Sequence, residues 1–237
     1  MSRSPDPLSP TGTQPGSSSA ATARSGALRL ALGLLGLLAC LIVLGVLADD
    51  VREQEASALD ALANPFFHQL ASPWLDRLME GATFLGGYDA IGPVLVVVGI
   101  WLLLIRRPRE LLFVLVAIAG SVALNQTLKL IFHRPRPQLA WASTLPDFSF
   151  PSGHAMNSLV LYLALAIVVW QIGGRRIGRV AVVLAVVLAI AIGVSRIYLG
   201  YHYLTDVVAG FAAAILWLAM VVAVFRGPGL LRRRLAR

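Results

Sequence analysis

The chain has 237 residues, of which 57% are hydrophobic and only 14% charged, and its mean hydropathy is +0.76. This composition excludes an ordinary soluble domain and is typical of a membrane protein that crosses the bilayer several times. The formal net charge of +8 lies mostly at the ends of apolar segments. It therefore indicates membrane topology and attraction to anionic lipids, and not nucleic-acid binding.

The N-terminal segment, residues 1–26, is rich in Ser, Pro, Thr, Gly and Ala and has no apolar periodicity. Such a segment buries too little apolar surface to order itself, so we expect a disordered cytoplasmic tail. The first apolar run, Leu30 to Ala48, exceeds the roughly 7–15 residues of a signal-peptide core, which favours an uncleaved span. The single cysteine, Cys40, lies in this run and can form no intrachain disulfide.

Six apolar segments approach the length of about 20 residues that a membrane-spanning helix needs. They are residues 30–48, 87–105, 111–132, 155–172, 180–194 with its flanks, and 203–225. We therefore predict an all-α polytopic membrane protein in which residues 27–226 form one domain of six transmembrane helices. Residues 227–237 would form a basic cytoplasmic tail.

The first connection, residues 49–86, is long, and its early part is acidic. Apolar side chains then recur at roughly helical spacing, at Phe66, Phe67, Leu70, Trp74, Leu75, Leu78 and Met79. This pattern predicts an amphipathic helix lying in the membrane interface. Such a helix could form the lip over which a lipid headgroup enters, or serve only as a structural cover.

The basic residues are distributed unevenly between the two sides of the predicted helices. Fourteen of the 20 lie in the N-terminal tail, the second and fourth connections and the C-terminus, while six lie in the odd-numbered connections. Because cytoplasmic segments carry the excess of Lys and Arg, both termini are predicted to be cytoplasmic. The odd-numbered connections then face the periplasm or the cell exterior.

Candidate functional residues gather on that outer side, at the ends of the third to sixth predicted helices. Lys129, the only lysine, sits near the outer end of the third helix, where an ionisable group costs about 2.5–3.5 kcal/mol unless it snorkels to the interface. Two Arg-Pro pairs follow, at Arg134 and Arg136, and spacing alone does not choose between them. Arg196, near the outer end of the fifth helix, has a planar fork suited to two phosphate oxygens.

Ser152, Gly153 and His154 open the fourth predicted helix. The backbone N–H groups and positive dipole end of a helix start can face an anion, although a simple turn with an N-cap would use the same residues. His154 is positioned to donate a proton to a leaving oxygen.

His202 and Asp206 stand four residues apart at the outer start of the sixth helix. On a helix face the carboxylate could accept from one imidazole nitrogen and leave the other free to attack. An ordinary helix pair is the alternative, and a metal site made of His154, His202 and Asp206 is another. The three cations Lys129, Arg136 and Arg196 would repel a divalent metal and attract a phosphate.

Other polar residues are less informative. His133 borders the candidate site, and His68 falls in the long first outer connection. We expect Asn125 and Gln126 to bond neighbouring helices.

The three segments read K-x6-R-P, P-S-G-H and S-R-x5-H-x3-D in order. These three motifs resemble the signature of the type-2 phosphatidic acid phosphatase family, which shares its site with vanadium haloperoxidases. The resemblance covers about residues 87–225. Its spacing selects Arg136, and Arg134 is then expected to contact only a loop or a headgroup.

The resemblance implies an integral membrane lipid phosphatase that works through a phosphohistidine and needs no metal or organic cofactor. His202 would attack phosphorus, oriented by Asp206, and His154 would protonate the departing oxygen. Lys129, Arg136, Arg196 and the N–H groups near Ser152 and Gly153 would hold the phosphate oxygens.

A site open to the bilayer favours a lipid phosphate as substrate. The candidates are phosphatidate, phosphatidylglycerol phosphate and an undecaprenyl-type diphosphate, of which we favour the last. The alternatives are an anion or lipid transporter that uses the same cations without hydrolysis, and a haloperoxidase that uses bound vanadate.

Overall fold

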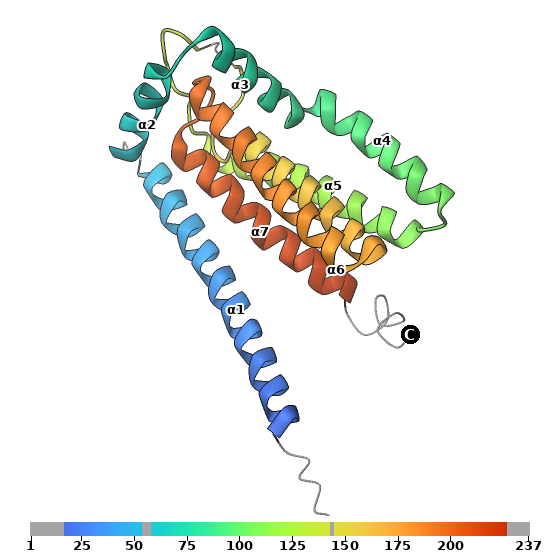
Figure 1. Ribbon diagram of the computed structural model, residues 1–237. Coiled ribbons are helices and arrows are strands. Elements are labelled where there is room, and N and C mark those ends of the chain that lie inside the picture. The colour runs from blue at the N-terminus through green and yellow to red at the C-terminus, as the bar shows by residue number, and fades with distance from the viewer. Residues whose placement is uncertain (1–16, 54–57, 143–144, 227–237) are drawn as a thin grey trace, which may run out of the picture. The chain divides into compact units, whose positions relative to one another are not determined.

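The computed structural model describes residues 17–53, 58–142 and 145–226, and within these residues every regular element is a helix (Figure 1). The prediction of an all-α fold is confirmed. The helices are α1 (Ser17–Arg52), α2 (Ala58–Gln69), α3 (Pro73–Leu85), α4 (Tyr88–Leu104), α5 (Pro108–Phe132), α6 (Gly153–Tyr198) and α7 (Leu204–Arg226).

The chain divides into two compact units, residues 1–38 and 39–237. Helix α1 begins at Ser17, so the described part of the predicted N-terminal tail is helical, contrary to the expectation of disorder up to residue 26. Residues 1–16 and the predicted C-terminal tail, 227–237, lie outside the described residues.

The first connection contains two helices where one amphipathic helix was predicted. Helix α2 ends at Gln69, and α3 starts at Pro73, which suits the first turn because its missing N–H would have no partner there. Large apolar side chains of α3 are more than half exposed, as at Trp74 and Leu78. Their position relative to a membrane interface stays a prediction.

Among the residues that the structure describes, four helices are long and apolar enough to cross a membrane, namely α1 from Leu30, α5, α6 and α7. The bent pair α3–α4, with an angle of 50° between the two helices, makes a fifth candidate if it is counted as one span. The chain is therefore a multi-pass membrane protein.

Helix α6 is not one straight rod. Its 46 residues would extend about 69 Å at 1.5 Å per residue, yet His154 near its start and Arg196 near its end line the same cavity. The helix breaks at Gly174, where φ is +79°, a conformation that favours glycine, and its two arms lie side by side (Figure 1). These arms contain the predicted segments 155–172 and 180–194.

Small residues let α5, α6 and α7 approach closely. A Cβ at Gly120 of α5 would lie 1.9 Å from the indole ring of Trp217 on α7, and that indole donates a hydrogen bond to the carbonyl of Ala117 at 2.8 Å. Ala164 and Ala189, one on each arm of α6, are fully buried in the same core. Such small-residue contacts are how membrane helices pack, since lipid supplies no hydrophobic force between them.

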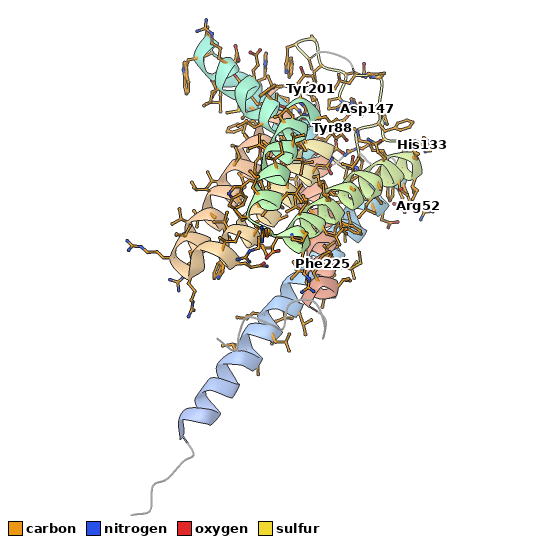
Figure 2. The ribbon with its side chains drawn as sticks, turned by 90° about the vertical axis from the view of Figure 1, so that its right-hand side faces the viewer. Arg52, Tyr88, His133, Asp147, Tyr201 and Phe225 are labelled. Carbon is orange, nitrogen blue, oxygen red and sulfur yellow. The ribbon has the colours of Figure 1, made fainter. Side chains whose placement is uncertain are left out.

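The α3–α4 turn, the loop after α5 and the α6–α7 turn gather at one end of these helices. Figure 2 shows Tyr88, Asp147 and Tyr201 near that end, while Phe225 on α7 lies farther along the bundle. Helix α5 stops at His133, whose left-handed φ of 47° lets its N–H bond back to the carbonyl of Lys129 at 3.0 Å. The loop that follows, up to Gly153, borders the candidate site.

Candidate active site

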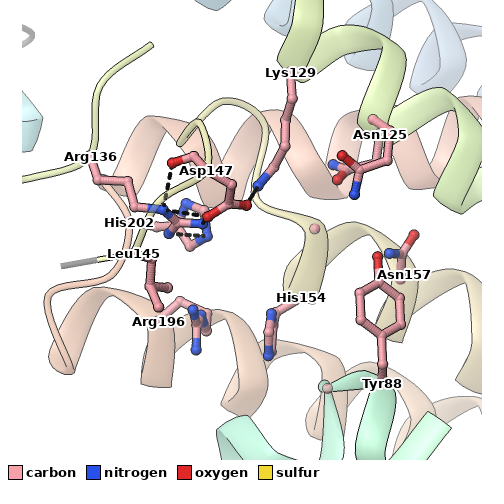
Figure 3. A pocket seen from close by; sticks show the side chains of 13 residues that line it. Tyr88, Asn125, Lys129, Arg136, Leu145, Asp147, His154, Asn157, Arg196 and His202 are labelled. Atoms are coloured by element: carbon pink, nitrogen blue, oxygen red, sulfur yellow. Dashed lines mark hydrogen bonds and ion pairs between the residues drawn. The ribbon is translucent and has the colours of Figure 1, made fainter. Parts of the chain in front are cut away.

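A cavity of about 140 Å³ lies where α5 ends and both ends of α6 meet (Figure 3). It is lined by six of the eight residues selected from the sequence: Lys129, Arg136, Gly153, His154, Arg196 and His202. The other two, Ser152 and Asp206, are fully buried behind them.

Lys129 and Arg136 share one partner, Asp147. The Lys129 ammonium bonds one carboxylate oxygen of Asp147, and Arg136 bonds the other through Nε at 3.0 Å and Nη2 at 2.6 Å. Both cations are more than nine-tenths buried, whereas the Asp147 side chain is 50% exposed. The carboxylate of Asp147 therefore occupies the two cations at which the sequence predicted a bound phosphate.

Asp147 is fully ionised in this setting. Burial by itself would raise the pKa of its carboxyl, but the hydrogen bond and charge of Lys129, and then those of Arg136, lower the pKa to about 2.

His202 lies in the turn between α6 and α7, and not on a helix face as we predicted, because α7 begins only at Leu204. Asp206, in the first turn of α7, still reaches it: the His202 Nδ1 atom is 3.4 Å from Oδ2 of Asp206. Ser149 Oγ donates to the same Oδ2 at 2.5 Å and lies 3.3 Å from Nδ1.

The other ring nitrogen of His202, Nε2, lies 3.2 Å from Nη1 of Arg136. A guanidinium has only donors, so Nε2 must present its lone pair, and the proton sits on Nδ1 toward Asp206. Burial lowers the pKa of His202 to about 4; Asp206 opposes that shift, and the charges of Arg196 and Arg136 reinforce it. The imidazole is thus neutral at pH 7, with its lone pair directed to the cation cluster.

Arg196, on the second arm of α6, is buried and donates from Nη1 to Thr83 Oγ1 at 2.7 Å. Its guanidinium also lies over the ring of Tyr201, 4.2 Å from the centroid. Its Nε has no hydrogen-bond partner in the described part of the chain. An anion in the cavity could satisfy this buried donor.

His154 is the first residue after Gly153 in α6, and it lines the cavity opposite the Lys129–Asp147 pair (Figure 3). Room for its ring comes from Gly86: a Cβ there would lie 3.2 Å from Cδ2 of His154. Within the described residues, the ring of His154 has no hydrogen-bond partner.

Ser152 serves as the N-cap of α6, accepting from the N–H of Ala155 at 3.5 Å. Its own N–H donates to the carbonyl of Asp206 at 3.0 Å. That N–H is therefore occupied, and the prediction that it faces the phosphate does not agree with this geometry. Gly153 is required for close packing, because a Cβ there would lie 2.9 Å from Oδ1 of Asn125.

The prediction for Arg134, a loop or headgroup contact, is wrong. Its Nη1 donates to Asp206 Oδ1 at 2.6 Å, and its Nη2 donates to Asp60 Oδ2 at 2.8 Å. Asp60 in turn accepts from the N–H and hydroxyl of Thr205 at 2.9 and 2.6 Å. Burial lowers the pKa of Arg134, but Asp206 and Asp60 outweigh it, so the net pKa is raised and the charge is secure.

The remaining polar residues divide between site and scaffold. Asn125 and Gln126 line the cavity, and Asn125 bonds the carbonyl of Pro151 at 3.1 Å. His133 packs edge-on against Phe148, and His68 of α2 stacks on Trp141.

The geometry also bears on the metal-site alternative. Among the described residues, no group of three or more His, Cys, Asp or Glu side chains is placed to hold a metal ion. The cavity instead brings together three cations and two imidazoles, a donor set that suits a phosphate-like anion.

Four residues of this arrangement were missed by the sequence analysis: Asp147, Ser149, Asp60 as a site residue, and Thr83. One signal was available, because Asp147 is the only acidic residue among residues 111–205 and stands just before Ser152. Asp60 carried none, since it is one of several acidic residues in the first connection.

The fold and the cavity together define a multi-pass membrane protein with a cavity lined by three cationic side chains and two imidazoles. Residues 110–228 match the PAP2 superfamily. The chain is 30% identical to phosphatidylglycerophosphatase B of Bacillus subtilis (strain 168) over 178 residues, which cover 74% of this chain and 88% of the relative. It is also 30% identical to the undecaprenyl-diphosphatase BcrC of the same organism, over 60% of this chain and 70% of the relative.

Solved structures agree. The crystal structure described as the first transmembrane PAP2 type phosphatidylglycerolphosphate phosphatase, from Bacillus subtilis, matches with a TM-score of 0.72 and 28% identity, over 79% of this chain and 94% of that one. LpxE from Aquifex aeolicus shares the fold with a TM-score of 0.57 at 24% identity, over 71% and 97% of the two chains. The chain belongs to the PAP2 superfamily, and it is a membrane phosphatase of the lipid-phosphate-hydrolysing kind.

Proposed function

We propose that this protein removes a terminal phosphate from a membrane lipid through a phosphohistidine formed on Nε2 of His202. One observation carries the proposal: the lone pair of a neutral imidazole lies 3.2 Å from an arginine whose other edge holds an anion. A phosphoryl group on that arginine would stand beside the nucleophile.

In the first step Nε2 of His202 forms a bond to phosphorus while the bond to the lipid oxygen breaks. Asp206 accepts a hydrogen bond from the Nδ1–H of His202, without taking the proton, and stabilises the imidazolium character that develops. His154 donates a proton to the departing oxygen, and Lys129, Arg136 and Arg196 stabilise the charge on the phosphoryl oxygens. In the second step His154 takes a proton from water, which attacks phosphorus and releases phosphate from His202.

The membrane arrangement we propose has six crossings, in which α6 supplies two and the α3–α4 pair supplies one. The positive-inside rule then puts both termini in the cytoplasm and the site at the outer face. In a Cys40→Ala background, Ala140→Cys should react with a membrane-impermeant thiol reagent added outside, and Arg175→Cys should not. The opposite labelling pattern would show that the candidate site faces the cytoplasm and that the proposed topology is wrong.

The substrate we favour is an undecaprenyl-type diphosphate, with phosphatidylglycerol phosphate and phosphatidate as the other candidates. The relatives named for undecaprenyl-diphosphatase and phosphatidylglycerophosphatase activity support this group. They do not favour a transporter that uses the same pocket without hydrolysis. Phosphate release by the detergent-purified protein from these three lipids, measured side by side, ranks them by kcat/KM.

The intermediate is tested by rapid-quench trapping with labelled p-nitrophenyl phosphate. His202→Ala should yield no phosphohistidine, whereas His154→Ala should still label, because the phenolate leaves with little protonation. On the lipid substrate His154→Ala should lose about 10²–10⁴-fold in rate. If His202→Ala is labelled and His154→Ala is not, then His154 is the nucleophile and His202 is the general acid.

The anion-site chemistry is tested with a chelator. We expect activity to survive excess EDTA, because the charges that bind phosphate are side-chain cations, and to be inhibited by vanadate as a five-coordinate analogue. If EDTA abolishes activity and a divalent ion restores it, the enzyme uses a metal and the proposed mechanism is wrong.

A further inference from the structure

The cation cluster of the site is occupied by a side chain of the protein itself. Asp147 places one carboxylate oxygen on Lys129 and the other on the Nε/Nη2 edge of Arg136 (Figure 3). That edge is the one with which a guanidinium grips two oxygens of a phosphate. We call these contacts of Lys129 and Arg136 the phosphate seat.

Only one anion can use the seat at a time. The opposite edge of Arg136 is already engaged, since Nη1 donates to the carbonyl of Tyr201 at 2.6 Å and lies against His202. A phosphoryl group near His202 must therefore take the Nε/Nη2 edge, and the carboxylate has to leave it.

The Asp147 side chain can leave without the loop moving. Its backbone carbonyl also accepts from Arg136 Nε at 3.1 Å, so this N–H is shared between the carbonyl and the carboxylate, and the residue stays beside the seat. The side chain is half exposed while both cations are buried, so the carboxylate enters from the open side of the cavity.

The charges of the cavity are consistent with an exchange of this kind. Three cations face one carboxylate in the structure, and Asp147 is the sole acidic residue among positions 111–205. A free phosphate that remained bound to three unopposed buried cations would leave slowly. A carboxylate held next to the seat competes for it at the moment the product departs.

We propose that Asp147 is the resting occupant of the phosphate seat, displaced by the phosphoryl group of the substrate and returning when phosphate leaves. The residue thereby sets how tightly the enzyme retains free phosphate. This inference rests on the proposed function, because it takes the seat to be where the phosphoryl group binds. Burial alone would raise the pKa of Asp147, but Lys129 and Arg136 lower it to about 2, so the carboxylate on the seat is ionised near neutral pH.

Direct binding of inorganic phosphate to the full-length protein in detergent tests the proposal without turnover. Asp147→Asn keeps the shape of the side chain and removes its charge, and Asp147→Ala removes the competitor altogether. If the seat is occupied by Asp147 for nine-tenths of the time or more, either variant should lower the Kd for phosphate by about tenfold or more. The Ki for phosphate as product inhibitor should fall in parallel.

Glu80→Gln is the matched control, because Glu80 is an exposed acid on α3 with no side-chain hydrogen bond in the described residues. It removes the same charge from the protein and should leave the Kd unchanged. An Asp147→Asn protein that binds phosphate with unchanged or weaker affinity overturns the proposal and makes Asp147 a residue that holds Lys129 and Arg136 in place. Thermal unfolding of both Asp147 variants shows whether they are folded.

Failure of the inference and failure of the proposed function give different results. If the function is wrong and the inference is right, phosphate binding tightens in the variants although His202→Ala retains activity or phosphoenzyme. If the function is right and the inference is wrong, His202→Ala is inactive while the Kd for phosphate does not fall in either Asp147 variant.

Discussion

Arg134 and Arg136 stand in two identical Arg-Pro pairs, yet they belong to two different regions. Arg134 bonds Asp60 and Asp206, whose side chains are 4% and 0% exposed. Arg136 bonds Asp147, whose side chain is 50% exposed. Arg134 therefore pairs with two buried acids behind His202, a group that we call the sealed region, whereas Arg136 lies at the cavity in front of His202, which we call the open region.

The exposure of the acidic partners explains why one arginine acts as a structural residue and the other can bind a ligand. Breaking a buried ion pair leaves an uncompensated charge out of water, so the partners of Arg134 are effectively permanent. The carboxylate of Asp147 is half exposed and can return to water, but Lys129 and Arg136 are buried, so the carboxylate can be exchanged only when another anion takes its place. The sealed region holds Asp206 and through it the His202 tautomer, and the open region is where we propose that the anion binds.

The largest effect is expected from Arg134→Ala. The substitution leaves two carboxylates buried without their cation, a defect that costs on the order of 3–5 kcal/mol. Both the unfolding free energy in detergent and the activity should fall. Arg52→Ala, which removes an exposed arginine, is the control, and equal stability of the two variants would show that the network is not structural.

Arg136→Ala should leave stability near that of the parent and lower kcat by about 10²–10³-fold, the effect of removing one transition-state donor. Steady-state kinetics on a lipid phosphate, together with thermal unfolding, separates this outcome from the previous one. A variant that unfolds as readily as Arg134→Ala would contradict the division into a sealed and an open region.

Asp60→Asn should have a smaller effect, because the amide still fits between Arg134 and Thr205 but gives up one charge. We expect a loss on the order of 1–3 kcal/mol, as for a buried hydrogen bond to a charged group. The stability and kcat/KM of this variant should decline together. Glu80→Gln, which changes an exposed acid of α3, is the control. An equal loss in that variant would disprove a particular role for Asp60 beside Arg134.

The smallest effect concerns the protonation of His202. The charge of Arg136 is one cause that keeps the pKa of His202 near 4, so Arg136→Gln should raise that pKa. Because a His pKa below its usual value favours the neutral form in the folded state, the parent loses stability as pH falls from about 6.5 towards 4. The variant should lose less over that window.

An NMR titration of the ring protons reads this shift directly. The chain has four histidines, and comparison with the His202→Ala protein identifies the signal of His202. A pKa for His202 that is unchanged in Arg136→Gln would mean that the two side chains do not interact in solution.

The helical class, the membrane location and most of the polar residues that line the cavity could be predicted from the order of residues along the chain. Hydropathy is a sum over neighbouring residues, so it can be read without knowing which helices meet. The pattern of Lys129, His154 and Arg196 near helix ends likewise depends on positions along the chain, and the structure brings all three to one cavity. The break between α2 and α3 also lies next to Pro73, a helix-start signal that the sequence contains.

The partner of each charged side chain follows only from the tertiary structure. Arg134 reaches Asp60 and Asp206 across 74 and 72 residues of sequence, and these contacts exist because α2, the loop after α5 and the start of α7 meet at one end of the bundle. Arg136, two residues farther on, is directed to the cavity and to Asp147. An ion pair depends on the distance and burial of two side chains in space, quantities that local sequence does not contain.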